Sequence, residues 1–133
     1  MRIPILKLGD ILLTSIQSDI SDEHALMLQT DILQRMDQSR ARGVVLDITS
    51  LDIVDSYMAR ILTETARMAQ LMGGEVVITG MNPMVALTLV EMGRELLGVL
   101  TALTLQQGID KIKDRLAILE GDRGEEAPNA ANG

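Results

Sequence analysis

The sequence predicts a single α/β domain built on a mostly parallel sheet. Short runs of β-branched and other apolar residues alternate with longer segments that have helical periodicity. A Gly-Asp pair separates the first two apolar runs, which is a hairpin signal. Strands that alternate with helices need crossover connections, and these make neighbouring strands parallel. The predicted order is β-β-α-β-α-β-α-β-α, a mixed sheet with an antiparallel hairpin at its start and about four helices.

The first part of the chain supplies the hairpin and one helix. Residues 3–8 and 11–16 are predicted as short strands on either side of Gly9 and Asp10. Ser21 can cap the next helix, because its side-chain oxygen accepts from a free backbone N–H group. The apolar positions of that helix share one face and form its predicted core side: Ala25, Leu28, Ile32, Leu33 and Met36.

A central strand over 44–48 leads into the clearest helical pattern of the chain, over 56–72. Gly73 and Gly74 end this helix, since a left-handed glycine often follows a helix C-terminus. Its predicted core face is made by residues at helical spacing: Met58, Ile61, Leu62, Thr65, Met68, Ala69 and Met72.

The remaining elements follow the same alternation. A strand over 75–80 precedes a helix with Asn82 as its N-cap and Pro83 as its first residue. A last strand over 99–105 precedes a final helix. The domain is expected to span residues 1–116, and the polar, acidic stretch 117–133 is expected to be a flexible tail.

Composition narrows the function classes. The formal net charge of −7 argues against nucleic acid, whose phosphates need a basic surface. No apolar run reaches the roughly 18 residues of a membrane span, and the N-terminus lacks the form of a signal peptide. The chain has no cysteine, so disulfides and thiolate metal sites are excluded. We expect a cytoplasmic protein with no membrane partner, no cofactor and no metal.

The residues of an enzyme are largely missing. His24 is the one histidine, and an exposed position on a helix is the favoured interpretation. There is no phosphate-binding glycine loop followed by Lys and Ser or Thr. Asp47, Asp52 and Asp55 lie at or after the end of the central strand and could bind magnesium. A solvated loop with a helix cap is favoured over that site, and the chain is predicted not to be an enzyme.

Ser56 is the residue on which chemistry is expected. Either Asp55 or Ser56 can cap the helix that begins here. A phosphate on Ser56 would add about −1.5 to −2 charges, which the positive end of a helix tolerates and a docked partner does not. Tyr57, the one aromatic residue of the chain, is expected on the first turn and off the core face. Asp55 and Tyr57 are therefore predicted to contact a partner.

Three stretches together resemble the STAS domain family: "MRIPILKLGDILLTSIQSDISD", "DITSLDIVDSYMARIL" and "GGEVVITGMNPMVALTLVEMG". The segment "LTLQQGIDKI" near the end fits the same pattern. Within that family the chain is similar to the RsbS-type antagonists of bacterial stressosomes, over about residues 1–116. The Asp-Ser pair before the second helix is shared by the whole anti-sigma-factor-antagonist superfamily.

The resemblance implies a non-catalytic scaffold protein. RsbS-type proteins self-associate and co-assemble with RsbR-type sensor proteins into a large particle that holds an RsbT-type serine kinase. The kinase phosphorylates the serine of the Asp-Ser pair, here Ser56, and leaves to activate a general stress response. An RsbX-type phosphatase reverses the modification.

Three alternatives stay open at this point. RsbR-type relatives carry a second phosphoacceptor threonine, which matches Thr88 here, although a half-buried helix residue is the favoured interpretation of Thr88. The chain could also be a free-standing anti-anti-sigma factor that binds an anti-sigma kinase one to one. A magnesium-dependent hydrolase using the three aspartates is the enzyme alternative.

Overall fold

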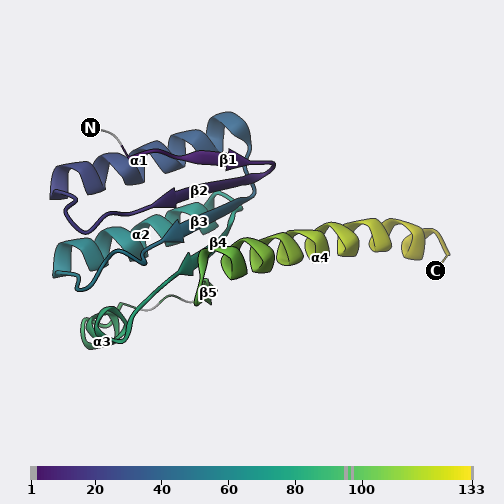
Figure 1. Ribbon diagram of the computed structural model, residues 1–133. Coiled ribbons are helices and arrows are strands. Elements are labelled where there is room, and N and C mark those ends of the chain that lie inside the picture. The colour runs from purple at the N-terminus through teal and green to yellow at the C-terminus, as the bar shows by residue number, and fades with distance from the viewer. Residues whose placement is uncertain (1–2, 95, 97, 133) are drawn as a thin grey trace.

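The computed structural model describes residues 3–94, 96 and 98–132 of the 133-residue chain. Within these residues, five strands and four helices follow one another in the predicted order, and Figure 1 shows one layer of strands between helices. The elements are β1 (Leu6–Leu8), β2 (Ile11–Ser15), α1 (Asp22–Ser39), β3 (Gly43–Asp47), α2 (Ser56–Leu71), β4 (Glu75–Thr79), α3 (Pro83–Glu91), β5 (Leu100–Ala102) and α4 (Leu105–Asn132).

The sheet has the spatial order β1-β2-β3-β4-β5, so each strand pairs with the next one in sequence. β1 is antiparallel to β2, with Lys7 opposite Leu12, and all later pairs are parallel. Both parts of the prediction, the starting hairpin and the parallel remainder, are confirmed. Parallel pairing brings the carboxyl ends of β2, β3 and β4 to the same end of the sheet, where Ser15, Asp47 and Thr79 lie in register.

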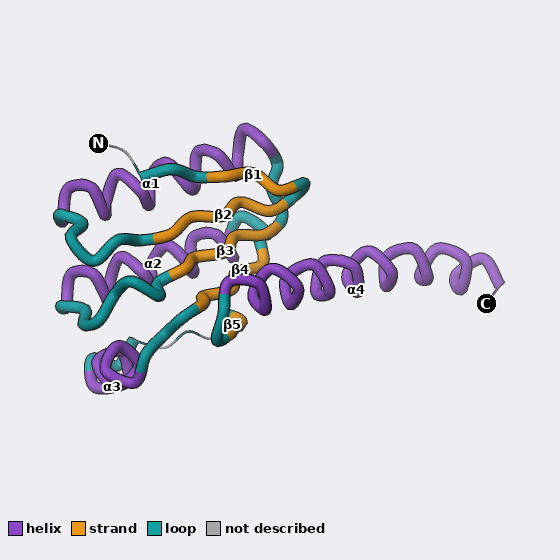
Figure 2. Tube along the Cα trace, viewed as in Figure 1, coloured by secondary structure: helices purple, strands orange, loops and turns teal. Residues whose placement is uncertain are grey.

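Helices cover both faces of the sheet (Figures 1 and 2). On one face α1, α2 and α3 pack on the strands, with side chains such as Leu46, Ile78 and Leu62 fully enclosed. On the other face, within the described part of the chain, α4 packs through Ile109, Ile112 and Leu116. The β-branched run of β3 is buried on both faces, as expected for a central parallel strand.

Several predicted boundaries were too wide. β1 begins at Leu6 rather than at residue 3, and Pro4 just before it has no N–H group to give to a strand pair. β5 ends at Ala102 rather than at residue 105, because Thr104 already serves the next helix. Its backbone oxygen and hydroxyl accept from the N–H groups of Gly108 and Gln107.

One other expectation differs from the structure. Met72 was expected on the core face of α2, but it is the C-cap residue and is 47% exposed. α4 extends as helix to Asn132. The flexibility of residues 117–133 stays a prediction. Leu116 is the last buried side chain among the described side chains of α4. The domain boundary at residue 116 stays a prediction.

Candidate phosphorylation site

The start of α2 separates the roles of Asp55 and Ser56. Asp55 is the N-cap: its Oδ1 accepts from the Met58 N–H group at 2.8 Å, and its backbone is extended. Ser56 is the first helical residue and is exposed. Its hydroxyl makes no hydrogen bond within the described part of the chain. The sequence left the cap open between these two residues, and the structure assigns it to Asp55. Among the described residues, the Ser56 hydroxyl therefore supports no part of the fold by a hydrogen bond.

The loop before Ser56, residues 48–55, is anchored from below by apolar side chains. Ile48, Leu51 and Val54 are buried in the core under α1, α2 and α3. The backbone N–H of Ile48 donates to Thr79 O at 2.9 Å, and that of Leu51 donates to Ile48 O at 3.0 Å. Every third residue of the loop thus points into the protein, which fixes the path of the chain up to the serine.

Asn82 holds the same loop from the side. Its amide Nδ2 donates to Leu51 O at 2.9 Å and to Asp52 O at 3.0 Å. Its Oδ1 accepts from Val85 N–H at 2.8 Å, which is the predicted N-cap of α3. One side chain therefore joins the start of α3 to the loop that leads into α2.

This second role of Asn82 was missed in the sequence. The N-cap position was correctly predicted, but the partners of its amide group lie about 30 residues earlier in the chain. The usable signal was topological: both segments follow adjacent parallel strands, so they meet at the same edge of the sheet.

Asp47 at the end of β3 collects three hydroxyl groups. Ser15 donates to its Oδ2 at 3.1 Å, while Thr49 and Thr79 donate to its Oδ1 at 2.7 and 2.9 Å. These donors come from the ends of β2 and β4 and from the loop. The half-buried carboxylate thus links the ends of β2, β3 and β4 to the loop that follows β3.

The positions of the three aspartates bear on the hypothesis of a magnesium site. Asp52 and Asp55 are exposed, and the Asp55 carboxylate caps α2. Within residues 3–94, 96 and 98–132, no group of three His, Cys, Asp or Glu side chains is placed to hold a metal ion. The structure does not bring Asp47, Asp52 and Asp55 together as the enzyme alternative requires.

Gly80 lets the loop lie close to the end of β4. Its φ of +78° is a conformation that L side chains rarely adopt. A Cβ atom here would overlap the Thr49 hydroxyl and approach Thr49 Cα to 2.9 Å. The glycine therefore allows the close approach through which Thr49 reaches Asp47.

Tyr57 is half-buried and packs against the core under α1 and α2, so the expectation that it lies off the core face was wrong. An exposed large apolar side chain of the loop before the serine is Ile53, at 72%. Asp55 keeps an exposed position. The role of Asp55 and Tyr57 in binding a partner stays a prediction.

The other singled-out residues lie on other helices. Thr88 is half-buried on α3, and its hydroxyl donates to Met84 O at 2.9 Å. His24 lies in the first turn of α1, where its ring Nδ1 is 2.9 Å from the Ser21 hydroxyl. That hydroxyl also accepts from the His24 N–H group, so Ser21 is the predicted N-cap.

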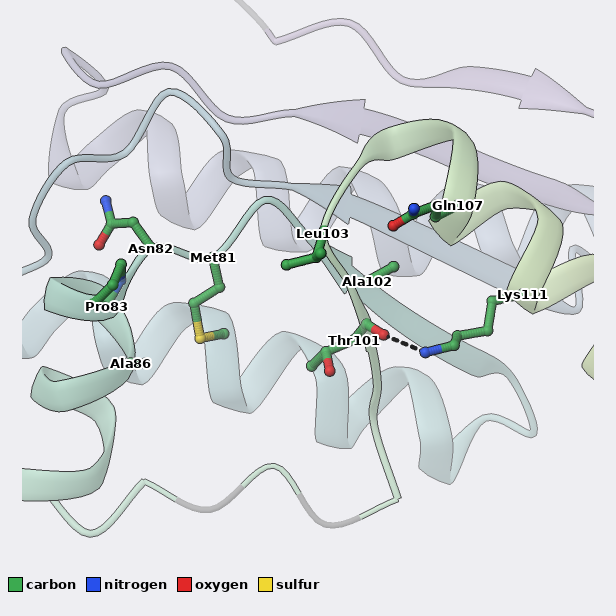
Figure 3. Close-up of a pocket in the computed structure, with 9 residues that line it drawn as sticks. All are labelled: Met81, Asn82, Pro83, Ala86, Thr101, Ala102, Leu103, Gln107 and Lys111. Atoms are coloured by element: carbon green, nitrogen blue, oxygen red, sulfur yellow. Dashed lines mark hydrogen bonds between the residues drawn. The ribbon is translucent and has the colours of Figure 1, made fainter.

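A groove of about 790 Å³ lies between α3, β5 and the start of α4 (Figure 3). Most of its lining is apolar or amide, and the Lys111 ammonium group in it donates to Thr101 O at 2.7 Å. Asn82 and Pro83 lie at the α3 side of the groove. Asn82 thus belongs both to this groove and to the support of the loop before Ser56.

Comparisons with known proteins agree on one family. The model of the STAS domain matches residues 2–111. A curated relative, the RsbT co-antagonist protein RsbRA of Bacillus subtilis, is 29% identical over 106 residues, which cover 77% of this chain. The chain spans only 39% of that relative's length. Of the helices that the structure describes, none has the length and apolar character to cross a bilayer.

Two solved structures are more similar. A serine-to-glutamate variant of RsbS from Moorella thermoacetica has 38% identity and a TM-score of 0.81, with 88% of this chain and 99% of that chain covered. A chain of the stressosome, described as a signal integration and transduction hub, has 40% identity and a TM-score of 0.77. The match covers 85% of this chain and 98% of the stressosome chain.

Proposed function

The chain belongs to the STAS domain family, and from that premise we propose that it is an RsbS-type scaffold protein of a stressosome. In this proposal it holds an RsbT-type serine kinase and releases it when Ser56 is phosphorylated. The similarity to RsbS and to a stressosome chain, over almost the whole length of each, supports the scaffold role. The downstream effect is regulation of a general stress response.

One observation carries the choice of Ser56. Its hydroxyl is exposed, makes no hydrogen bond among the described residues, and lies on the first turn of a helix whose cap is the neighbouring Asp55. A kinase can therefore modify it without breaking a contact. The γ-phosphoryl group of ATP passes to Ser56 Oγ, ADP leaves, and the hydroxyl proton passes to a base of the kinase.

The added charge acts on the partner more than on the fold. A phosphate carries about −1.5 to −2 charges and next to the N-terminal end of a helix it meets favourable backbone N–H groups. The exposed Asp52 and Asp55 already make the surface around Ser56 acidic. A kinase surface that fits the unmodified serine and the exposed Ile53 of the preceding loop meets a strongly negative surface after phosphorylation.

The proposed protein is a substrate and scaffold rather than a catalyst. The Ser56 hydroxyl has no hydrogen-bonded base among the described residues, which supports a role as substrate. The proposed partners are RsbR-type sensor proteins and further copies of this chain in the particle, the RsbT-type kinase, and an RsbX-type phosphatase. Asp55 and Tyr57 are proposed as contacts of the kinase, and Thr88 as a secondary acceptor.

The first test is phosphorylation and kinase binding. Incubation with the RsbT-type kinase and ATP should place phosphate on Ser56, as read by phosphopeptide mass spectrometry, and Ser56→Ala should lose it. Unmodified protein should bind the kinase, and Ser56→Asp should bind it more weakly. Equal binding of the wild type and Ser56→Asp would reject the switch.

The second test is assembly. Light scattering on a mixture with an RsbR-type protein should give a particle of about a megadalton. A kinase complex of one copy each, with no large particle under the same conditions, would instead support a free-standing anti-anti-sigma factor.

A further inference from the structure

Arg60 lies one helical turn after Ser56, on the same side of α2. Residues four apart on a helix have Cβ atoms about 5–6 Å apart. In the unmodified protein Arg60 Nε is 3.2 Å from Glu64 Oε1, and both side chains are substantially exposed, at 54% and 42%. The guanidinium group is therefore held by a single surface carboxylate, within the part of the chain that the structure describes, and is accessible to a competitor.

The order of charges along the helix favours a phosphate on Ser56 over Glu64 as the partner of Arg60. In pairs four residues apart, an acid that precedes the base is better than the reverse order. Arg60 precedes Glu64, so the present pair has the less favourable order. A phosphate on Ser56 would precede Arg60 and give the better order. Helical side chains also lean toward the N-terminus, which directs Arg60 toward residue 56.

Charge and hydrogen-bond geometry also favour the phosphate over Glu64 as the partner of Arg60. A phosphate carries up to two charges and three acceptor oxygens, whereas Glu64 offers one charge. The planar guanidinium group binds phosphate with two parallel hydrogen bonds. The other ionisable groups described around this end of α2 come from α2 itself, from the loop and from the first turn of α1, which packs against α2: Tyr57, Asp52, Asp55, Asp22, Glu23 and His24. Arg60 is the base that lies one turn from the serine.

We propose that Arg60 is the intramolecular partner of phosphorylated Ser56, and that phosphorylation replaces the Arg60–Glu64 ion pair with an Arg60–phosphate pair. This inference rests on the proposed function only in taking Ser56 as the modified residue. The phosphate is then fixed in one position along α2, and Glu64 is left without its base. A partner or a phosphatase meets an ordered, partly neutralised phosphate with a newly released carboxylate two turns away.

The test uses full-length protein with phosphoserine incorporated at position 56 during translation, so that no kinase is needed. Phosphorus NMR over a pH series gives the second acid dissociation constant of the phosphate. An adjacent guanidinium group stabilises the dianion, so this constant should be about threefold larger in the wild type than in Arg60→Gln. Arg60→Lys should retain part of the difference, because it keeps the charge but not the planar fork.

Two variants of the same helix complete the design. Arg67→Gln removes the same charge further along α2 and should leave the constant unchanged. Glu64→Gln removes the competitor and should leave the constant equal to the wild-type value or larger. Equal constants in the wild type and Arg60→Gln would overturn the proposal, as would an equal decrease in Arg67→Gln.

The proposal and the switch itself fail in different ways. If the kinase leaves Ser56 unmodified while the NMR difference is present, the proposed function fails and the Arg60 contact stands. If the kinase modifies Ser56 and the dissociation constants of the wild type and Arg60→Gln are equal, the proposed function stands and the Arg60 contact fails.

Discussion

The side chain of Asn82 offers the sharpest test of how the loop before Ser56 is held. It has two separable functions: its Oδ1 caps α3, and its Nδ2 donates to two carbonyl groups of the loop. Asn82→Ser keeps a side-chain oxygen that can cap but has no amide to reach the loop. Asn82→Ala removes both. The pair of variants therefore divides the contribution of one residue.

The magnitudes follow from the environment of each bond. A hydrogen bond contributes about 0.5–1.5 kcal/mol to folding. The bond to Leu51 O is partly buried and the bond to Asp52 O is exposed, where water can replace the donor. We therefore expect Asn82→Ser to lower the free energy of unfolding by about 1–2 kcal/mol. Asn82→Ala should lose about 1 kcal/mol more, the usual value of an N-cap.

The assay is urea denaturation, compared between variants whose free energy of unfolding depends equally steeply on urea concentration. Thermal unfolding supports it, since a loss of about 1 kcal/mol lowers the melting temperature by about 4 °C for a domain of this size. Amide hydrogen exchange adds a local readout: residues 48–55 should exchange faster in Asn82→Ser, while the amides of α1 serve as the internal control. If Asn82→Ser is as stable as the wild type and its loop equally protected, the amide contributes nothing. The apolar anchors would then hold the loop alone.

The remaining predictions concern the cap, the tight glycine and the end of α4. Ser56→Ala should change the free energy of unfolding by less than about 0.5 kcal/mol, because the Ser56 hydroxyl makes no hydrogen bond to the described residues. Asp55→Ala should lower the same free energy by about 1 kcal/mol in urea denaturation, and the opposite ranking would return the cap to Ser56. Gly80→Ala should lower the free energy of unfolding by more than about 2 kcal/mol, since it adds a clash with Thr49 to a positive φ. Gly73→Ala, at φ +92° with open space around it, should lower it by only about 1 kcal/mol in the same assay. Equal losses would show that the clash is not a cause. Removal of residues 122–133 should leave the melting temperature unchanged within about 2 °C, because the described buried side chains of α4 end at Leu116. A chain that ends before Leu116 should have a clearly lower melting temperature. A large decrease on removal of 122–133 alone would contradict a domain boundary near residue 116.

The order of the elements was predictable because each depends on short-range patterns. The β-branched run of β3 and the apolar face of α2 have different periods, and Asn82 with Pro83 marks a helix start by local chemistry. The boundaries were less predictable where two elements compete for one residue. Thr104 fits a strand by propensity, but its oxygen atoms bind the N–H groups at the start of α4.

The candidate site divides in the same way. Ser56 and Asp55 are neighbours in the chain, so their position at a helix start could be predicted. The contacts of Asp47 with Ser15 and Thr79 each cross 32 positions, and no local pattern contains them. Tyr57 was expected off the core because helical spacing places it beside the Met58 face, yet a large ring on a first turn can still fold back onto apolar neighbours. Such long-range contacts depend on how the strands are ordered in space.

The two edges of the sheet have a consequence for a protein that is proposed to work in many crowded copies. Both edge strands, β1 and β5, are only three residues long. Pro4 lies just before β1, and Lys7 is exposed within it. Short edges that carry a charge or lie beside a proline resist strand-to-strand addition between molecules. Copies held at high local concentration can therefore meet through their helices and side-chain surfaces without merging into a continuous, irreversible sheet.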